Sequence, residues 1–398
     1  MEADEFEALF SEQRSLEPVD VPVGAMSPLE RFKRIMSFQP VDRVIDREFG
    51  YWNDTYRRWH TEGLPRFIDN EAKANVYFGF DNWSRSIPAN TNLQPAFEVE
   101  VLEDRGQTKI IYDSNRVKCE VFSDGTDTIP HYLDFPIKDR ESYLPFKERL
   151  VPNLEKRIKT DLQSFSKKVE NRNYVLMAPG GSTAGMVRNW MGFEDICLAI
   201  YDQPELLEEI LDDLSDVSSN VAAEICAHMT PDLVCWWEDI AYKNGPIVTP
   251  DWFKETCGKA IKKVMDVYRG AGVEHAFVDC DGDFRSLMPG WLDNGVDIMF
   301  PLEVASGVHP ENLRKENSGI RMMGGFDKVA LIKGKSEIRK ELNRLKPLVE
   351  EGGFIPHVDH RVQPDVSLEN YLYYLEAKRD IFGIENRVSD ETLKVEVA

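Results

Sequence analysis

The stretch Glu274-His-Ala-Phe-Val-Asp-Cys-Asp-Gly-Asp283 decides the fold, because a short apolar run ends there in a thiol and a cluster of carboxylates. Apolar runs of this length between turn signals are typical of buried strands. Cys280 then lies at the carboxyl end of a strand, where barrel enzymes place their chemistry. Two other strand-like runs end in the same way: Leu233–Glu238 before Asp239, and Phe354–Ile355 before His357, Asp359 and His360. We expect the rest of the chain to bring these three ends together.

The composition is that of a globular protein with a strong negative charge. Apolar residues make up 42% of the 398 residues, which is ample for a core, and the formal net charge of −22 repels nucleic acid and anionic membranes. No apolar run reaches about 18 residues, and the acidic N-terminus lacks the pattern of a signal peptide. The six cysteines are scattered without a CxxC pair, as reduced thiols are. These features predict a cytoplasmic protein without nucleic-acid or membrane partners.

The first third of the chain carries two additions to the main fold. Residues 1–25 are acidic and aperiodic, so we expect a mobile tail or an arm lying on a neighbouring subunit. Ser27 as N-cap and Pro28 in the first turn predict a helix over Ser27–Met36. Over residues 96–122 the hydrophobic period changes to two, with turn signals between three segments. This pattern predicts a small antiparallel β-meander inserted into the main fold.

From Leu144 onwards, strand signals alternate with long amphipathic helices, which indicates βα units and a parallel sheet. A further strand is expected before Gly50 and an eighth near Val76–Phe80. The predicted fold class is therefore α/β, a (β/α)8 TIM barrel with an N-terminal extension and the β insertion. No linker divides residues 26–390, so they are expected to form one domain. The other expected strands are Tyr174–Ala178, Leu233–Glu238, His275–Cys280, Val296–Pro301, Ile320–Gly324 and Gly353–Ile355.

Polar residues at the predicted strand ends could form a metal site. A thiol, imidazoles and carboxylates that converge in a pocket have the composition of a catalytic Zn²⁺ site. The alternative is a purely structural role, in which Cys280 packs in the barrel and His357 and His360 only hold a loop. Gly180–Thr183 could cradle an anion or simply form a glycine-dependent turn. The tryptophans beside the strand ends could wall a pocket for a flat substrate or belong to the core.

Five motifs carry a resemblance to a known family: Phe38-Gln-Pro-Val-Asp-Arg43, Tyr201-Asp-Gln-Pro-Glu-Leu206, Glu238-Asp-Ile-Ala-Tyr-Lys-Asn-Gly-Pro246, Gly324-Gly-Phe-Asp-Lys328 and Gln363-Pro-Asp-Val-Ser-Leu-Glu-Asn370. They resemble the uroporphyrinogen decarboxylase superfamily, and within it the corrinoid-dependent methyltransferases and their demethylase relatives. The similarity runs from about residue 27 to residue 382 and implies a (β/α)8 barrel. The decarboxylases carry an arginine-rich signature at the end of the first strand, whereas the equivalent stretch here, Arg47–Trp52, lacks those arginines. The resemblance therefore implies a methyltransferase rather than a porphyrinogen decarboxylase.

The resemblance also implies a ligand set for zinc. The methyltransferase branch holds Zn²⁺ with a His-x-Cys motif at one strand end and a second cysteine at the last. The matching positions are Val278, Cys280 and His360, so the first ligand is lost and the last is exchanged. An acidic residue has to complete the set. The expected ligands are Glu238, Cys280 and His360, with Glu303 and His357 as alternatives.

The function implied by the resemblance is zinc-dependent methyl transfer between a small methylated substrate, for example an aryl methyl ether, and a corrinoid (cobalamin) protein. Asp239 would donate a proton to the leaving oxygen. The residues expected to shape the substrate and corrinoid side are Tyr51, Trp52, Tyr242, Lys243 and Arg361. The resemblance also implies a homodimer, the state that is common in this family. Two alternatives stay open: a decarboxylase of the uroporphyrinogen decarboxylase type, and a non-catalytic barrel that binds a tetrapyrrole or a partner.

Overall fold

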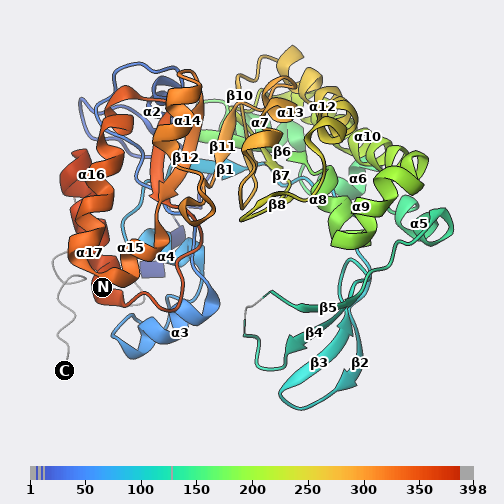
Figure 1. The fold of residues 1–398 in the computed structure, drawn as a ribbon. Coiled ribbons are helices and arrows are strands. Elements are labelled where there is room, and N and C mark those ends of the chain that lie inside the picture. The colour runs from blue at the N-terminus through green and yellow to red at the C-terminus, as the bar shows by residue number, and fades with distance from the viewer. Residues whose placement is uncertain (1–5, 8–9, 12–13, 127–128, 386–398) are drawn as a thin grey trace. The chain divides into compact units, whose positions relative to one another are not determined.

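The computed structural model describes residues 6–7, 10–11, 14–126 and 129–385. The chain forms two compact units, each assembled from segments far apart in the sequence (Figure 1). Unit 1 contains Met1–Arg85, Lys168–Val175 and Pro301–Ala398, and unit 2 contains Ser86–Lys167 and Leu176–Phe300. The sequence-based division into a tail of residues 1–25 and one domain of residues 26–390 includes residues outside the described ranges and stays a prediction.

Unit 2 is built on parallel strands joined by helical crossovers, as the alternating pattern predicts. Neighbouring strands follow the chain order β6 (Val175–Gly181), β7 (Leu233–Trp237), β10 (His275–Asp279) and β11 (Ile298–Phe300). Parallel neighbours need such crossovers because each strand must return to the same end of the sheet. The longest of them, α10 (Pro204–His228), begins with Pro204 at its first turn and packs its apolar stripe against α12 (Gly258–Gly270).

The remaining helices and strands of unit 2 are shorter. They are α5 (Arg140–Lys147), α6 (Leu154–Arg157), α8 (Ala184–Met191), α9 (Phe193–Asp202), the hairpin of β8 (Ala241–Tyr242) and β9 (Gly245–Pro246), α11 (Pro250–Trp252), a π-helix (Phe253–Cys257), a 3-10 turn (Arg285–Leu287) and α13 (Met288–Leu292). Helix α7 (Leu162–Val169) and strand β1 (Ser84–Ser86) lie at the unit boundaries.

The predicted β insertion is confirmed and is larger than expected. It is a four-stranded antiparallel sheet in the order β2 (Glu100–Asp104), β3 (Thr108–Tyr112), β4 (Lys118–Phe122) and β5 (His131–Asp134). The period-two pattern identified the first three strands. The fourth was missed because His131-Tyr-Leu-Asp134 is short and exposed along its whole length, so its residues do not alternate between a buried and a solvated face.

Unit 1 contains a parallel strand pair, β12 (Arg321–Phe326) and β13 (Phe354–Val358). The segment before Gly50 is joined to the end of this pair by a single parallel bridge, Tyr51 to Val362, rather than by a ladder. The Glu48 carboxylate accepts from the Val358 backbone N–H at 3.0 Å, so a side chain takes the place of a ladder partner. The helices are α2 (Pro28–Met36), α3 (Asn53–Thr61), α4 (Glu71–Tyr77), α14 (Pro310–Glu316), α15 (Lys328–Lys333), α16 (Lys335–Glu351) and α17 (Leu368–Phe382), with a 3-10 turn at Val304–Ser306.

The strand predicted near Val76–Phe80 is wrong, because residues 71–77 form helix α4 with Asn70 as its N-cap. Val76 is buried on one face of this helix, and Phe78 is buried as its C-cap residue. A short apolar run does not distinguish a strand from a helix. The α/β class with parallel strands is thus confirmed, whereas closure into eight strands stays a prediction.

A buried ion cluster anchors the last helix of unit 1. Asp46 accepts from Arg379 Nε at 2.8 Å and pairs with Lys378 Nζ at 3.0 Å, and all three side chains are almost fully excluded from solvent. Burial by itself raises the pKa of Asp46, but the two cations hold it below its ordinary value. The cluster ties α17 to the strand-like segment before Gly50.

The described part of the N-terminal segment is packed against its own chain, contrary to the expected tail. Val19 exchanges two hydrogen bonds of 2.7 Å with the Asn173 side chain, and the Tyr174 hydroxyl donates to the Leu16 carbonyl at 2.8 Å. Phe6 is fully buried with its ring 5.0 Å from that of Phe67. Apolar and amide contacts therefore hold this acidic segment, which its composition did not reveal.

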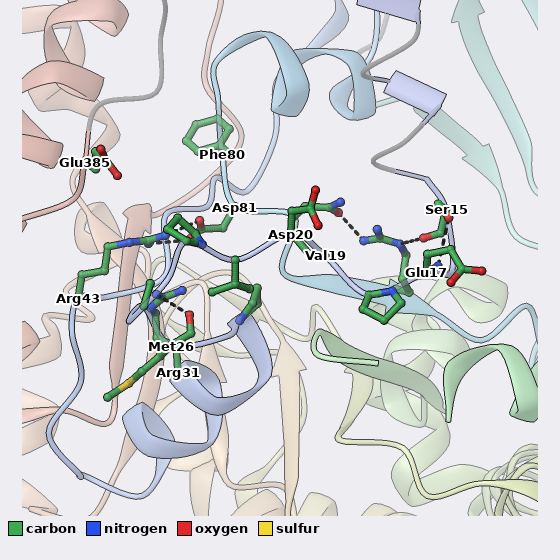
Figure 2. A pocket seen from close by; sticks show the side chains of 17 residues that line it. Ser15, Glu17, Val19, Asp20, Met26, Arg31, Arg43, Phe80, Asp81 and Glu385 are labelled. Carbon is green, nitrogen blue, oxygen red and sulfur yellow. Dashed lines mark hydrogen bonds and ion pairs between the residues drawn. The ribbon is translucent and has the colours of Figure 1, made fainter. Parts of the chain in front are cut away.

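The N-terminal segment also lines a cavity of about 490 Å³ in unit 1 (Figure 2). Arg43 points at Asp81 there with an N–O distance of 2.6 Å, and Arg31 is paired with Asp42 at the same distance. The third arginine, Arg85, donates to the Asn82 side chain and to the Ser15 carbonyl. The arginines therefore hold the segment and its neighbours in place. In the part of the chain that the structure describes, no helix is both long and apolar enough to cross a membrane.

Candidate active site

Glu238, at the end of β7, is held by the turn that follows β6. Its Oε1 accepts from the Thr183 N–H at 2.8 Å and from the Thr183 hydroxyl at 2.7 Å, and its Oε2 accepts from the Gly185 N–H at 2.9 Å. A side chain at Gly185 would place its Cβ 2.0 Å from the Glu238 carbonyl oxygen, so only glycine fits. Thr183, at the end of the Gly180–Thr183 turn, and Gly185 therefore hold the chain's own Glu238 carboxyl group.

Burial decides the protonation of Glu238. The side chain is fully buried, and burial raises its pKa from 4.5 to about 7, although the donors from Thr183 and Gly185 oppose the rise. Because both oxygens already have donors, Glu238 is better placed to fix the loop than to bind an ion. Its expected role as a metal ligand therefore differs from the role that its contacts indicate.

Asp239 follows in a left-handed backbone conformation, with φ of +42°. Such a conformation costs a non-glycine residue about 1–3 kcal/mol and recurs at functional sites. Its carboxylate pairs with Arg188 at 3.0 Å. Burial, and after it the charge of Asp281, raises the pKa of Asp239, while Arg188 lowers it. The predicted proton donor is thus a half-buried acid with a cationic partner.

Cys280 ends β10 and is fully buried. Its Sγ accepts from the Ile240 N–H at 3.4 Å, and burial raises the pKa of the thiol well above its ordinary value. The loop after it packs closely on β8: Gly282 has φ of +78°, and a Cβ there would lie 2.5 Å from the Ala241 carbonyl. Unit 2 thus joins the Glu238–Asp239 end and the Cys280 end through backbone contacts.

Tyr242 and Lys243 lie on the β8–β9 hairpin and are both exposed. The Tyr242 ring meets that of Phe193 edge to face at a centroid distance of 5.8 Å. Both side chains are therefore accessible, and their role in binding a substrate stays a prediction.

In unit 1, His360 lies between two aromatic rings. It stacks on Trp52 at 5.7 Å with an interplanar angle of 19° and meets Phe49 edge-on at 5.7 Å. One ring nitrogen of His360 lies within 4.8 Å of a carboxylate oxygen of Glu303. Trp52 and His360 are thus brought together, and the alternative ligand Glu303 offers a carboxylate close to this imidazole.

Asp359 organises the loops around this imidazole. It is fully buried and accepts from the backbone N–H groups of Val304 at 2.8 Å and Lys328 at 3.0 Å. Burial raises the pKa of Asp359 to about 7, against the lowering effect of Lys328. The Lys328 ammonium in turn binds Glu303 at 2.5 Å. Glu303 therefore has a built-in counter-charge.

Of the residues named for unit 1, Tyr51 lies elsewhere than expected, and Arg361 and His357 have partners within the chain. Tyr51 is buried, and its hydroxyl shares a 2.6 Å hydrogen bond with that of Tyr371, so it belongs to the core rather than to a substrate wall. Arg361 pairs with Glu71 at 3.5 Å. His357 is fully buried, which lowers its pKa well below 6.5, and its Nδ1 contacts the Val358 carbonyl at 2.8 Å. His357 therefore contacts the backbone of β13, which agrees with the alternative interpretation of this residue as a structural one.

Sequence reasoning missed Arg188, Thr183 as a hydrogen-bond donor, and Lys328 as the partner of Glu303. Arg188 precedes Asp239 by 51 positions, and no motif spacing links an arginine on a helix to a carboxylate on the following strand end. The predicted metal set itself draws Glu238 and Cys280 from unit 2 and His360 from unit 1.

The parallel strands, the helical crossovers and the acidic and thiol side chains at the strand ends define an α/β protein with the layout of an enzyme. The chain belongs to the uroporphyrinogen decarboxylase (URO-D) family, whose model matches residues 167–381, more than half of the sequence. The match covers the strand ends of Glu238, Cys280 and His360. It leaves out the N-terminal segment and the β insertion.

Two of the solved structures that resemble the chain have low sequence identity to it. A methyltransferase from Methanosarcina mazei is 16% identical with a TM-score of 0.58, over 90% of this chain and 99% of its own. A B12-independent methionine synthase from Shewanella sp. W3-18-1 in complex with selenomethionine is 14% identical with a TM-score of 0.37, over 56% of this chain and 67% of its own. The first similarity supports the fold. No curated protein matches the chain.

Proposed function

We propose that the protein is a zinc-dependent methyltransferase with a (β/α)8 barrel, which moves a methyl group between a small methylated substrate and a corrinoid protein. Methyl transfer is preferred over decarboxylation because the basic side chains near the strand ends are already paired with carboxylates. Arg188 is paired with Asp239, Arg361 with Glu71, and Lys328 with Glu303. A substrate with several carboxylates needs cations that are free to bind it, so these pairs disfavour a porphyrinogen.

The stretch that carries the arginines in the decarboxylases supports the same conclusion. Arg47 directs a guanidinium nitrogen at the Met323 sulfur, at 3.4 Å, and its guanidinium lies 5.1 Å from the Trp83 ring centroid. These contacts hold it inside unit 1. The methyltransferase from Methanosarcina mazei shares the fold over nearly its whole length, which agrees with the proposal.

The side chains present suit zinc, which prefers sulfur, nitrogen and oxygen ligands. His360 and Glu303 supply a nitrogen and an oxygen within 4.8 Å of each other, and Cys280 supplies sulfur. A metal bound by Glu303 would take the place of Lys328. Within unit 1 we therefore favour Glu303 beside His360 as ligands, while Cys280 stays the thiol ligand that the resemblance implies and Glu238 the alternative carboxylate.

Bound Zn²⁺ would act as a Lewis acid on a heteroatom of the methyl donor or acceptor, and the corrinoid of the partner would carry the methyl group. The chain's own residues position the substrate and move a proton. Asp239 would donate a proton to the leaving oxygen, a role favoured by the burial that raises its pKa, and Arg188 would stabilise the carboxylate left behind. The exposed Tyr242 of unit 2 would offer a ring face to a flat substrate such as an aryl methyl ether, and Lys243 lies exposed beside it. Trp52 of unit 1 stays the second aromatic residue that the resemblance implies.

Metal analysis tests the proposal. Protein purified without added zinc should contain about one zinc per chain. Cys280→Ala should lose it, and the control Cys226→Ala, a helix cysteine of unit 2, should retain it. Methylation of reduced cobalamin by candidate methyl ethers gives the activity. Zinc that survives Cys280→Ala would sink the ligand assignment, and protein without zinc or methyl transfer would favour the tetrapyrrole- or partner-binding barrel.

A further inference from the structure

Unit 2 contains a cavity of about 470 Å³ that none of the motifs predicts. One side comes from the β insertion, through β5 and the turn between β3 and β4. The other side comes from the end of α8, the start of α9 and Tyr242 on β8. Gly192, between α8 and α9, permits the two sides to meet: a Cβ there would lie 2.5 Å from the Phe135 ring. The cavity is thus a built feature of the insertion.

Aromatic rings line the cavity in two pairs. Phe193 and Tyr242 meet edge to face at 5.8 Å, and Tyr132 and Phe135 are tilted at 5.6 Å. Tyr242 is 55% exposed, Phe193 45% and Tyr132 42%. A cluster of large, exposed apolar side chains in one hollow is a common feature of binding sites.

The charge around these rings is negative. Four carboxylates line the cavity, against two basic side chains: Asp113, Asp134, Glu194 and Asp195, against Lys138 and Arg188. Lys138 is shared between Asp195 at 2.8 Å and Asp134 at 3.3 Å. Arg188 is engaged by Asp239, so neither base offers an uncompensated positive charge to an anion.

From this combination we propose that the cavity binds a small methylated ammonium compound. Aromatic faces attract a cation through the ring quadrupole, and they also accept its methyl groups, which hydroxyls or amides would not. The carboxylates at the rim add long-range attraction without having to contact the ligand. The inference concerns binding in unit 2 alone and does not depend on methyl transfer.

An aromatic carboxylate is the competing ligand class, because Arg188 also lines the cavity. It is disfavoured because an incoming carboxylate would have to displace Asp239 from Arg188 while facing the negative rim. A neutral apolar ligand is disfavoured by the charged side chains around the rings. The three classes differ in charge at equal size, which makes them separable by experiment.

Isothermal titration of the full chain with three probes tests the inference. Choline is the cation, 3,3-dimethylbutan-1-ol is its uncharged isostere, and benzoate is the aromatic anion. We expect saturable binding of choline, about tenfold or more tighter than that of the isostere. Equal binding of choline and the isostere, tighter binding of benzoate, or no saturable heat with choline each overturns the proposal.

Variants locate the site. Tyr242→Ala and Phe193→Ala should each weaken choline binding about three- to tenfold, because one ring face is lost. Tyr201→Ala is the matched control, since Tyr201 lies on the same helix as Phe193, is 73% exposed and does not line the cavity. Circular dichroism checks the fold of each variant. Choline affinity unchanged in both cavity variants would contradict the assignment, whatever the wild type binds.

Discussion

The protonation of Glu238 gives a prediction that can be worked through in numbers. Its folded-state pKa is about 7, against an ordinary value of 4.5. A raised pKa in an acid means that folding favours the protonated form, so the associated stability is complete below pH 4.5 and is lost as the pH rises to 7. A shift of this size corresponds to about 3 kcal/mol, most of which is lost between pH 5 and pH 8.

The variant Glu238→Gln isolates this contribution. A glutamine has the shape of the protonated acid but does not titrate, so the cost of its NH2 group facing a donor of Thr183 or Gly185 is the same at every pH. Relative to the wild type, its free energy of unfolding should therefore rise by about 2–3 kcal/mol from pH 5 to pH 8. Urea unfolding followed by tryptophan fluorescence, in the presence of a chelator, measures the difference. All other titrating groups are shared and cancel.

Glu208→Gln, on an exposed position of α10, serves as the control for the chemical change. Its difference from the wild type should not follow the same trend. A constant difference between Glu238→Gln and the wild type, or one that changes in the opposite direction, would refute the reasoning. It would mean that the donors from Thr183 and Gly185 outweigh burial and hold the ionised carboxylate.

The other predictions concern packing and the N-terminal segment. Asp46→Asn should lower the free energy of unfolding by about 3–5 kcal/mol, since it leaves two buried cations without their carboxylate. The same urea titration measures this loss, and a loss smaller than about 1 kcal/mol would contradict the prediction. Gly185→Ala should destabilise by about 1–3 kcal/mol or more because its methyl group meets backbone, whereas Gly270→Ala, with no atom within 4 Å, should be neutral or slightly stabilising in thermal melts. Asn173→Ala should release the N-terminal segment and speed limited proteolysis within residues 15–26; cleavage at the wild-type rate would show that other contacts suffice.

Local signals predicted most of the elements. Helix α10 (Pro204–His228) is one of the long amphipathic helices that the sequence indicates, with a leading proline and one face that is buried along the helix. Strand β10 was recognised because a buried parallel strand has apolar residues and then stops at polar ones. The error at Val76–Phe80 arose where a short helix buries the same residue types as a strand.

The sequence predicted which residue types lie at the candidate site, but not which of these side chains pair with one another. Cys280 and His360 were found at strand ends because a parallel sheet delivers side chains there whatever the reaction. The role of Glu238 was not predictable, since its donors lie 53 to 55 residues away and its burial depends on the completed fold. Tyr51 carried no sign that it would face Tyr371 rather than a substrate.

The sequence by itself determined which side chains stand at the ends of the parallel strands, because hydrophobic periodicity is a local property of the chain. It also carried the family, whose match spans residues 167–381. Only the tertiary structure decided which of these groups are paired, buried or open to a ligand. Protonation and charge pairing depend on burial and on partners brought from distant segments, as Arg188 is brought to Asp239 and the insertion's Tyr132 to the same cavity as Tyr242.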